Sequence, residues 1–307
     1  MFGIVPVDRQ LALADEALGS KYKFWFLDGD RRFLFKAEER GTGEDWAEKI
    51  ACHLCELVGL PHVHYELAEL YDGGRYIQPG VVCETCTPPP ASLVLGNQLL
   101  LKRDPQYPAQ DQRKFKVKEH TVAAVADVLS RLAPPAANWM ANVPAGIETA
   151  LDVFVGYVML DAWIANQDRH HENWAALWDD DLRLAPTFDH GASLARNLTD
   201  EKRKERLATR DRNPTVAFFA GKARSRFYQA PTDEHALGTV EAFAAFAQQD
   251  PLAAQIWLAR LAGVDRADVR RIVDEVPPKR MSNVAKEFTL ELLMVNQERL
   301  RKEATAA

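Results

Sequence analysis

The chain lacks any uninterrupted apolar run of the roughly 18 or more residues that a membrane-spanning helix requires. Its best candidate, residues 151–165, is 15 residues long and carries Asp152 and Asp161. The N-terminal stretch MFGIVPVDRQ has neither the basic start nor the cleavage pattern of a secretory signal. We therefore expect no membrane segment and a cytoplasmic location.

Cysteine is scarce, with four residues in a chain of 307. They form two C-x-x-C pairs, Cys52/Cys55 and Cys83/Cys86, and four thiolates are a complete tetrahedral set for zinc. The first pair lies in a helical pattern without the glycine-bearing turn of zinc ribbons, and the second lies where a strand enters a proline-rich loop. This context favours buried structural thiols and leaves zinc binding by the four cysteines open.

Positive charge is not in excess, because 38 Lys and Arg residues face 44 Asp and Glu residues and the net charge is −6. Direct DNA binding is therefore not expected. Residues 196–226 are an exception, with ten basic and four acidic side chains. The basic ones are Arg196, Lys202, Arg203, Lys204, Arg206, Arg210, Arg212, Lys222, Arg224 and Arg226. This segment is either a solvated face or a docking surface for an acidic partner, such as a nucleic-acid-associated protein substrate.

The first third of the chain is predicted to be rich in strands. KYKFWFLDG and RRFLFKAEE flank the turn DGD, a pattern typical of a β-hairpin. In GEDWAEKIACHLCELVGL, apolar residues such as Trp46, Ile50 and Leu54 recur at helical spacing before Gly59. HVHYELAELYDGGRYIQPGVVCE predicts two more strands around DGG.

Beyond about residue 118 the pattern becomes mainly helical, with helices expected over residues 120–132 and 146–165 and others toward the C-terminus. The expected fold is therefore α+β, with two lobes. A small sheet-rich lobe is predicted over residues 1–105, and a larger, mainly helical lobe over residues 106–307.

The polar stretch NQDRHHENW, residues 166–174, follows an apolar helical pattern directly. It is followed by two short strand patterns, WAALW and LRLAPTF, joined by an acidic turn. That layout brings Asp168 and Asn173, before the first strand, close to Asp189 after the second. Such a set is typical of a phosphoryl-transfer site, in which Asp168 would orient the attacking hydroxyl and accept its proton. Asn173 and Asp189 would hold Mg²⁺ against the ATP phosphates, since Mg²⁺ prefers hard oxygen ligands.

Transfer from ATP also requires a lysine for the phosphates and an acid that orients it. Lys36, at the end of the second hairpin strand, is the candidate lysine. Glu44 and Glu48 follow in the helical segment, and Glu48 is preferred because it precedes the apolar run. Upstream, the backbone at Gly19 and Ser20 and the side chains of Lys21 and Lys23 could cover a polyphosphate.

The stretch DAWIANQDRHHENWAAL…LAPTFDHGASL resembles the catalytic segment of the HipA-like and CtkA-like bacterial kinases. GSKYKFWF, LFK and AEKIACHLCELVGLP resemble the family's phosphate loop, strand lysine and helix glutamate in the same order. The resemblance covers roughly residues 15–305 and is strongest over 161–194. It implies a two-lobed protein-kinase-like fold and a protein serine/threonine kinase, in a family whose members often act as toxins with an antitoxin partner.

By this resemblance Asp168 matches the catalytic aspartate, Asn173 and Asp189 the magnesium ligands, Lys36 the phosphate lysine and Glu48 its partner. The segment Val82, Cys83 and Glu84 matches the hinge that receives adenine, and Ser20 the site of self-inhibitory autophosphorylation. One departure is that His190 and Gly191 follow Asp189, where eukaryotic kinases have Phe-Gly. A phenylalanine switch is therefore not expected.

Three alternatives remain. The acidic and histidine side chains of the same stretch (Asp168, His170, His171, Asp189 and His190) are of the types that bind zinc in a metallohydrolase. Zinc motifs, however, usually space histidines four residues apart. A kinase-fold binding protein without activity is disfavoured, because every required acid and the lysine are present. A phosphoinositide or small-molecule kinase is the stronger competitor, although no basic amphipathic membrane helix is evident.

Overall fold

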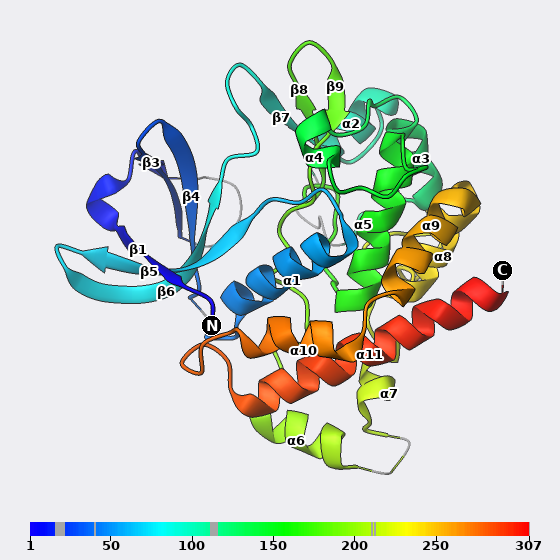
Figure 1. Cartoon of the computed structure of the whole chain (residues 1–307). Coiled ribbons are helices and arrows are strands. Elements are labelled where there is room, and N and C mark those ends of the chain that lie inside the picture. Colours follow the sequence, from blue (N-terminus) through cyan, green and yellow to red (C-terminus); the bar gives the residue numbers. More distant parts are fainter. Residues whose placement is uncertain (16–21, 40, 111–115, 210, 212, 307) are drawn as a thin grey trace.

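This computed structural model describes the whole chain except residues 16–21, 40, 111–115, 210, 212 and 307. The first strands are β1 Ile4–Asp8, β2 Ala14–Asp15, β3 Lys23–Asp28, β4 Arg31–Ala37, β5 Tyr65–Asp72 and β6 Arg75–Glu84, with a 3₁₀ turn, η1 Arg9–Leu11, after β1. They form one sheet in the order β1-β5-β6-β4-β3-β2 (Figure 1). β1 and β5 are parallel, and all other neighbours are antiparallel. The two predicted strand pairs are confirmed.

Side chains of this sheet alternate between two buried clusters, as the two-residue period of a strand requires. On one face Phe24, Phe35 and Val82 pack together. On the other face lie Val81 and Cys83. The alternation along β6 therefore decides which of its residues can reach a ligand on the second face.

α1 Glu44–Val58 follows β4 and packs against β5 and β6. It begins after Gly43 and ends at Gly59, and both glycines have positive φ angles, of 90° and 79°. At Gly59 a side chain would collide with the carbonyl oxygen of Asn142. Glycine is thus required there both by the left-handed backbone and by close packing.

The second part of the chain contains a three-stranded antiparallel sheet in the order β7-β8-β9, built from β7 Ser92–Leu95, β8 Ala175–Trp178 and β9 Leu182–Leu184. The other helices are α2 Gly96–Arg103, α3 Val122–Leu129, α4 Ala137–Met140, α5 Ala150–Ile164, α6 Asp200–Ala208, α7 Val216–Gly221, α8 Thr239–Gln249, α9 Pro251–Ala262, α10 Arg266–Asp274 and α11 Asn283–Ala306. Figure 1 shows α5 in the middle of this part, between β8–β9 and the C-terminal helices.

α5 is the central element of the larger core and is buried along nearly its whole length, as expected for a helix that is apolar on all sides. It starts with a capping box, in which the Thr149 hydroxyl accepts from the Asp152 N–H and the Asp152 carboxylate accepts from the Thr149 N–H. Trp257 of α9 donates from its indole nitrogen to the Asp152 carbonyl at 2.8 Å. This rigid helix carries the polar stretch that begins at residue 166.

The α+β class and the two-lobed layout are confirmed. The division at residue 105 stays a prediction, although β7 and α2 precede it in sequence while β7 pairs with β8 and α2 packs on α3. Across the part of the chain that the structure describes, no helix is both long and apolar enough to cross a membrane.

All four cysteines are free thiols. Among the described residues, no group of potential metal ligands contains more than one of them, so a four-thiolate zinc site is not formed. Cys55 is buried in α1, and Cys83 in β6, in agreement with structural thiols.

Candidate active site in the cleft between the lobes

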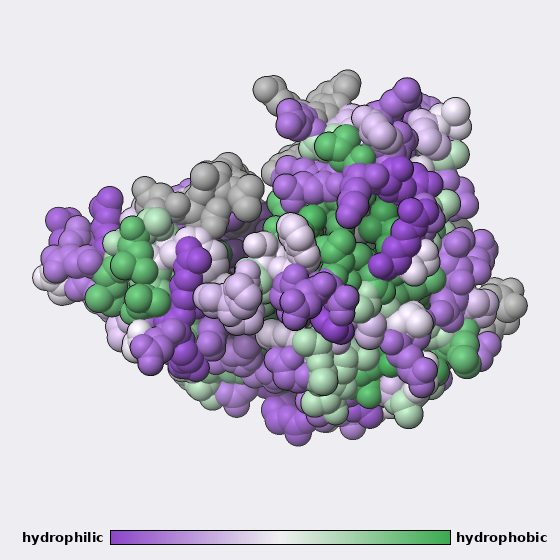
Figure 2. Space-filling view, turned by 90° about the horizontal axis from the view of Figure 1, so that it is seen from above, coloured by the Kyte–Doolittle hydropathy of each residue, from purple (hydrophilic) through white to green (hydrophobic). Residues whose placement is uncertain are grey.

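A cavity of about 1020 Å³ lies between the small sheet and the helical lobe. Its walls come from β3, β4, α1 and β6 on one side, and from residues 168–173 and 188–196 on the other. Figure 2 shows that the surface seen from above is mostly hydrophilic, with hydrophobic side chains gathered mainly on the helical lobe. A ligand in this cleft would touch both lobes.

Lys36 is at the centre of a contact network in the cleft. Its Nζ donates to Asp189 Oδ1 at 3.1 Å and to the Tyr65 hydroxyl at 3.3 Å, and lies 3.5 Å from Glu48 Oε1. The other carboxylate oxygen of Glu48 accepts the backbone N–H of His190 at 2.8 Å. Glu48 therefore ties Lys36 of the small lobe to the segment that carries Asp189.

Each member of this network is placed by a different element. Lys36 follows Phe35 in β4, and because alternate strand residues face opposite sides, Phe35 is buried in the sheet while Lys36 faces the cleft. Glu48 is one turn into α1. Asp189 has a φ of 60°, a left-handed conformation that aspartate tolerates better than most residues.

The residues after α5 are held by a buried ion pair. Arg169 donates to the Asp161 carboxylate from two guanidinium nitrogens, Nε and Nη2, and the distance from Nη2 to Oδ1 is 2.8 Å. Asp161 also accepts from the Asn166 amide at 2.8 Å, and Asn166 in turn accepts the Asp168 N–H at 3.1 Å. Arg169 thus pairs with a buried carboxylate and fixes the loop around Asp168.

Asn173 is fixed from the same loop. Its side-chain nitrogen donates to the Asp168 carbonyl at 2.7 Å, and its own carbonyl accepts from Arg169 at 3.2 Å. Because the amide nitrogen of Asn173 is used in this way, the amide oxygen is the atom left to act as a ligand. Asn173 and Asp189 both line the cleft, and an amide oxygen and a carboxylate are hard oxygen donors, so this pair fits Mg²⁺.

Burial and charge shift the titration of the central groups. Burial lowers the pKa of Lys36, but Asp189, Tyr65 and Glu48 together outweigh it and hold that pKa well above its ordinary value. Burial raises the pKa of Glu48 to about 7, against the opposing effect of Lys36. Burial also lowers the pKa of His190 well below its usual range, with Arg169 acting in the same direction. The cleft therefore keeps a permanent cation beside a carboxyl group that titrates near neutrality.

The structure brings most of the expected site residues to this cavity. Its walls include Lys23, Lys36, Glu48, Cys83, Glu84, Asp168, Asn173 and Asp189. Val82 does not line it, because its side chain packs on the opposite face of the sheet with Phe24 and Phe35. Gly19, Ser20 and Lys21 lie outside the described residues.

Several cleft residues had no clear signal in the sequence. Tyr65 contacts Lys36 and also accepts the Asp189 N–H at 3.4 Å, yet in the sequence it is only one residue within a predicted strand. Glu44 was a candidate partner of Lys36 in the sequence, but its pairing with Arg196, the first residue of the basic segment, had no signal there. Arg32 stacks over Trp25 at 4.3 Å from its ring centroid. The contacts of Tyr65 and Glu44 join residues that are distant in sequence, which local patterns cannot predict.

The zinc alternative for residues 168–190 is not favoured by the geometry. His170 accepts the Glu172 N–H at 3.1 Å, His171 contacts the Tyr107 hydroxyl at 2.9 Å, and His190 contacts the Thr187 hydroxyl at 2.8 Å. Among the residues that the structure describes, these histidines and aspartates do not form a metal-ligating group. Their hydrogen bonds order the loop instead.

The fold is shared with solved structures of CtkA and HipA, which confirms the resemblance seen in the sequence at the level of the fold. Among solved structures, the chain is similar to the proinflammatory kinase CtkA of Helicobacter pylori, with a TM-score of 0.71, 17% sequence identity and 97% of each chain covered.

It is also similar to a chain of the Shewanella oneidensis MR-1 toxin–antitoxin complex of HipA, HipB and operator DNA. That likeness has a TM-score of 0.51 and 12% identity, and it covers 96% of this chain and 66% of the other. No protein-family model and no curated protein sequence matches the chain.

Proposed function

We propose that this protein is an ATP- and Mg²⁺-dependent protein serine/threonine kinase. The observation that carries the proposal is the meeting of Lys36, Glu48 and Asp189 in one cleft that Asp168 and Asn173 also line. These five residues come from four separate parts of the chain. Phosphoryl transfer requires this combination of cation, metal ligands and base around one space. The fold shared with the kinase CtkA supports the same proposal.

In this proposal the chain mainly positions charges. Lys36 gives up its contact with Asp189 and binds phosphate oxygens of ATP instead. Glu48 keeps the ammonium group of Lys36 in place. Mg²⁺ held by Asn173 and Asp189 would neutralise charge on the transferred group. Asp168 accepts the proton of the substrate hydroxyl as its oxygen bonds to the γ-phosphorus and the bond to the β-phosphate oxygen breaks.

Adenine would lie against the end of β6, where Val81 and Cys83 face the cavity, and beside the chain that continues through Thr85. Backbone groups of Cys83 and Glu84 would serve as hinge contacts. Val82 would contribute through its backbone only, since its side chain is on the other face of the sheet.

The acceptor is proposed to be a protein hydroxyl. The basic segment that starts at Arg196 follows the metal-ligand region directly and would favour an acidic or nucleic-acid-associated substrate. By the likeness to the HipA complex, which contains HipB, an antitoxin-type partner is part of the proposal. Autophosphorylation at Ser20 is a further element of it.

The test is phosphate transfer from γ-labelled ATP with Mg²⁺, followed by mapping of the modified sites. Asp168→Asn should lower transfer by roughly 100-fold or more, because the base is lost, and should leave ATP affinity within about twofold. Equal loss of both would contradict the role of Asp168. Mapping also tests Ser20, whose assignment fails if that residue is never labelled.

The substrate class is decided by the acceptor that is labelled. Transfer to phosphoinositide vesicles or to small alcohols, with none to protein, would replace the protein-kinase proposal by a lipid or small-molecule kinase. ATP binding without transfer to any acceptor would indicate a binding protein with a kinase fold. Absence of ATP binding would overturn the proposal as a whole.

A further inference from the structure

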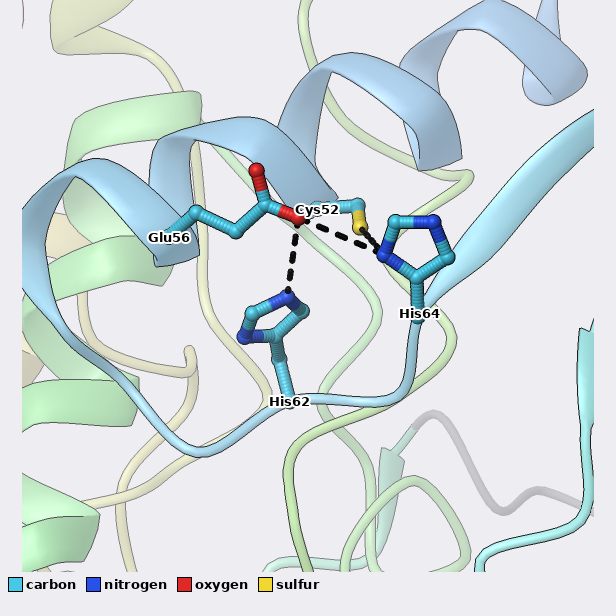
Figure 3. A group of neighbouring side chains, drawn as sticks. All are labelled: Cys52, Glu56, His62 and His64. Carbon is cyan, nitrogen blue, oxygen red and sulfur yellow. Dashed lines mark hydrogen bonds and ion pairs between the residues drawn. The ribbon is translucent and has the colours of Figure 1, made fainter. Parts of the chain in front are cut away.

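Four potential metal ligands meet outside the cleft, on the side of α1 that faces the start of β5. Cys52 and Glu56 come from α1, and His62 and His64 come from the segment that leads into β5 (Figure 3). One ligand atom from each side chain lies within 4.8 Å of all the others. Figure 3 shows the four side chains pointing toward one another.

The spacing of these atoms is close to that around a tetrahedral zinc ion. Cys52 Sγ is 3.4 Å from His64 Nδ1, and His64 Nδ1 is 3.3 Å from Glu56 Oε1. His62 Nε2 is 3.9 Å from the same carboxylate oxygen. Zinc–sulfur, zinc–nitrogen and zinc–oxygen bond lengths place ligand atoms about 3.3–3.6 Å apart in a tetrahedron. The remaining pairs of ligand atoms lie within 4.8 Å of each other, so the cluster would contract around the ion to reach that geometry.

Both histidines already have their other ring nitrogen engaged, as metal-binding histidines do. His62 Nδ1 lies 2.7 Å from the Leu60 carbonyl and must donate to it, which leaves Nε2 as the ligand atom. His64 Nε2 lies 2.7 Å from a carboxylate oxygen of Glu66, which leaves Nδ1. Glu66 is itself held by Lys49 at 2.9 Å. These outer contacts point both lone pairs at the same space.

The local sequence explains why the four converge. Residues 52 and 56 are four apart on a helix and so lie on one face of it, one turn apart. Residues 62 and 64 are two apart in an extended segment, and so they point to the same side. The turn at Gly59 brings the second pair back beside the first.

We propose that Cys52, Glu56, His62 and His64 form a binding site for Zn²⁺. One thiolate, two imidazoles and one carboxylate are all zinc ligands, and four protein ligands make a closed, structural site. Cys52 is buried, whereas the side chain of His64 is 51% exposed, so the ion has a path of entry from solvent. The proposal is independent of the kinase function.

Zinc would fasten the second half of α1 to the beginning of β5. Cys52 is one helical turn beyond Glu48, and His64 immediately precedes Tyr65. Glu48 and Tyr65 are the two residues that contact Lys36 from these elements. The ion would thus be a structural clamp between the helix and the strand that hold Lys36.

The test measures zinc directly in the full chain, without a histidine tag, by elemental analysis after expression with added zinc. The wild type should hold about one zinc per chain, and Cys52→Ser and His64→Asn should lose it. Cys55→Ala is the matched control, since Cys55 is a thiol of the same helix outside the cluster, and this variant should keep its zinc. Glu66→Ala should weaken zinc binding about 10–100-fold, because it removes the acceptor that holds the His64 ring.

A second measurement on the unmodified chain covers variants that fail to fold. After chelation, cobalt(II) added to the wild type should produce a thiolate-to-metal absorption band, and zinc should abolish the band and raise the melting temperature. A wild type that takes up neither ion, or a Cys52→Ser variant that keeps stoichiometric zinc, would overturn the proposal.

Discussion

Lys36 illustrates how much of this protein depends on single side chains. Its ammonium group is surrounded by oxygens of Asp189, Glu48 and Tyr65, which come from three different elements. Because a buried cation requires such partners, each of them influences both the charge and the position of Lys36. Substitutions at Asp189 and Glu48 should therefore affect different properties, namely ligand binding and the pH dependence of stability.

Asp189→Asn should weaken binding of Mg·ATP by about tenfold or more, because a carboxylate ligand of the proposed metal site is lost. Binding of ATP in the presence of a chelator should change little. Calorimetric titration under the two conditions separates these effects. Asp181→Asn, in the exposed turn between β8 and β9, is the control and should bind like wild type. Unchanged affinity for Mg·ATP in Asp189→Asn would show that the metal is held elsewhere.

Glu48 should make stability depend on pH. Its pKa rises from 4.5 to about 7 on folding, so between these values the folded protein retains a proton that the unfolded chain releases. Stability from this group therefore falls as pH rises from about 4.5 to 7. Glu48→Gln removes that dependence. The free energy of unfolding of this variant, relative to that of the wild type, should therefore increase by about 1–3 kcal/mol from pH 5 to pH 8. Urea unfolding at both values measures it, and a constant difference would contradict the assigned shift.

Among the elements, α1 has the most demanding position. Glu48 lines the cleft, Cys52 and Glu56 lie one and two turns further along the same side of the helix and meet the two histidines, and the helix ends at Gly59. A shift of this helix would disturb both sites together. A substitution at Gly59 tests how the end of this helix is fixed without changing a side chain of either site.

Gly59→Ala should destabilise the protein by about 1–3 kcal/mol, because alanine is strained at a φ of 79° and its side chain meets the Asn142 carbonyl. Gly221→Ala is the matched control, since Gly221 ends a helix, has no positive φ and has open space around it. That variant should be neutral or slightly stabilised. Urea unfolding of both variants decides the matter, and equal midpoints would argue against strain at Gly59.

At the scale of the whole molecule, the C-terminal part of the chain is bound to the small lobe. Arg280, between α10 and α11, donates to the Asp45 carboxylate at 2.7 Å and to the Ala68 carbonyl at 2.6 Å. Both charged side chains are buried. This contact joins the last helices to α1 and β5, so the two lobes are connected by more than the contacts of the cleft residues.

Arg280→Met should cost about 3–5 kcal/mol, because it leaves the buried Asp45 carboxylate without its cation. The neighbouring variant Lys279→Met removes an exposed contact to Glu69 and should cost less than about 1 kcal/mol. Denaturant unfolding of the two variants provides the comparison. Similar small losses would mean that Asp45 is stabilised without Arg280.

Much of the fold was predictable from local patterns. The hairpin of β3 and β4, the helix ending at Gly59, the strands around residues 73–74 and the apolar helix before residue 166 all follow from periodicity and turn residues, which act over short distances. The order of Lys36, Glu48, Asp168, Asn173 and Asp189 could likewise be read along the chain.

The sequence by itself determined the elements and the types of side chain they carry, because helix and strand periods and turn residues depend on near neighbours. Only the tertiary structure decided which distant side chains meet. Tyr65 reaches Lys36, Val82 turns away from the cleft, and Cys52 joins His64 rather than another cysteine. These outcomes depend on how the sheet, α1 and the segment after it pack in three dimensions, which no local pattern encodes.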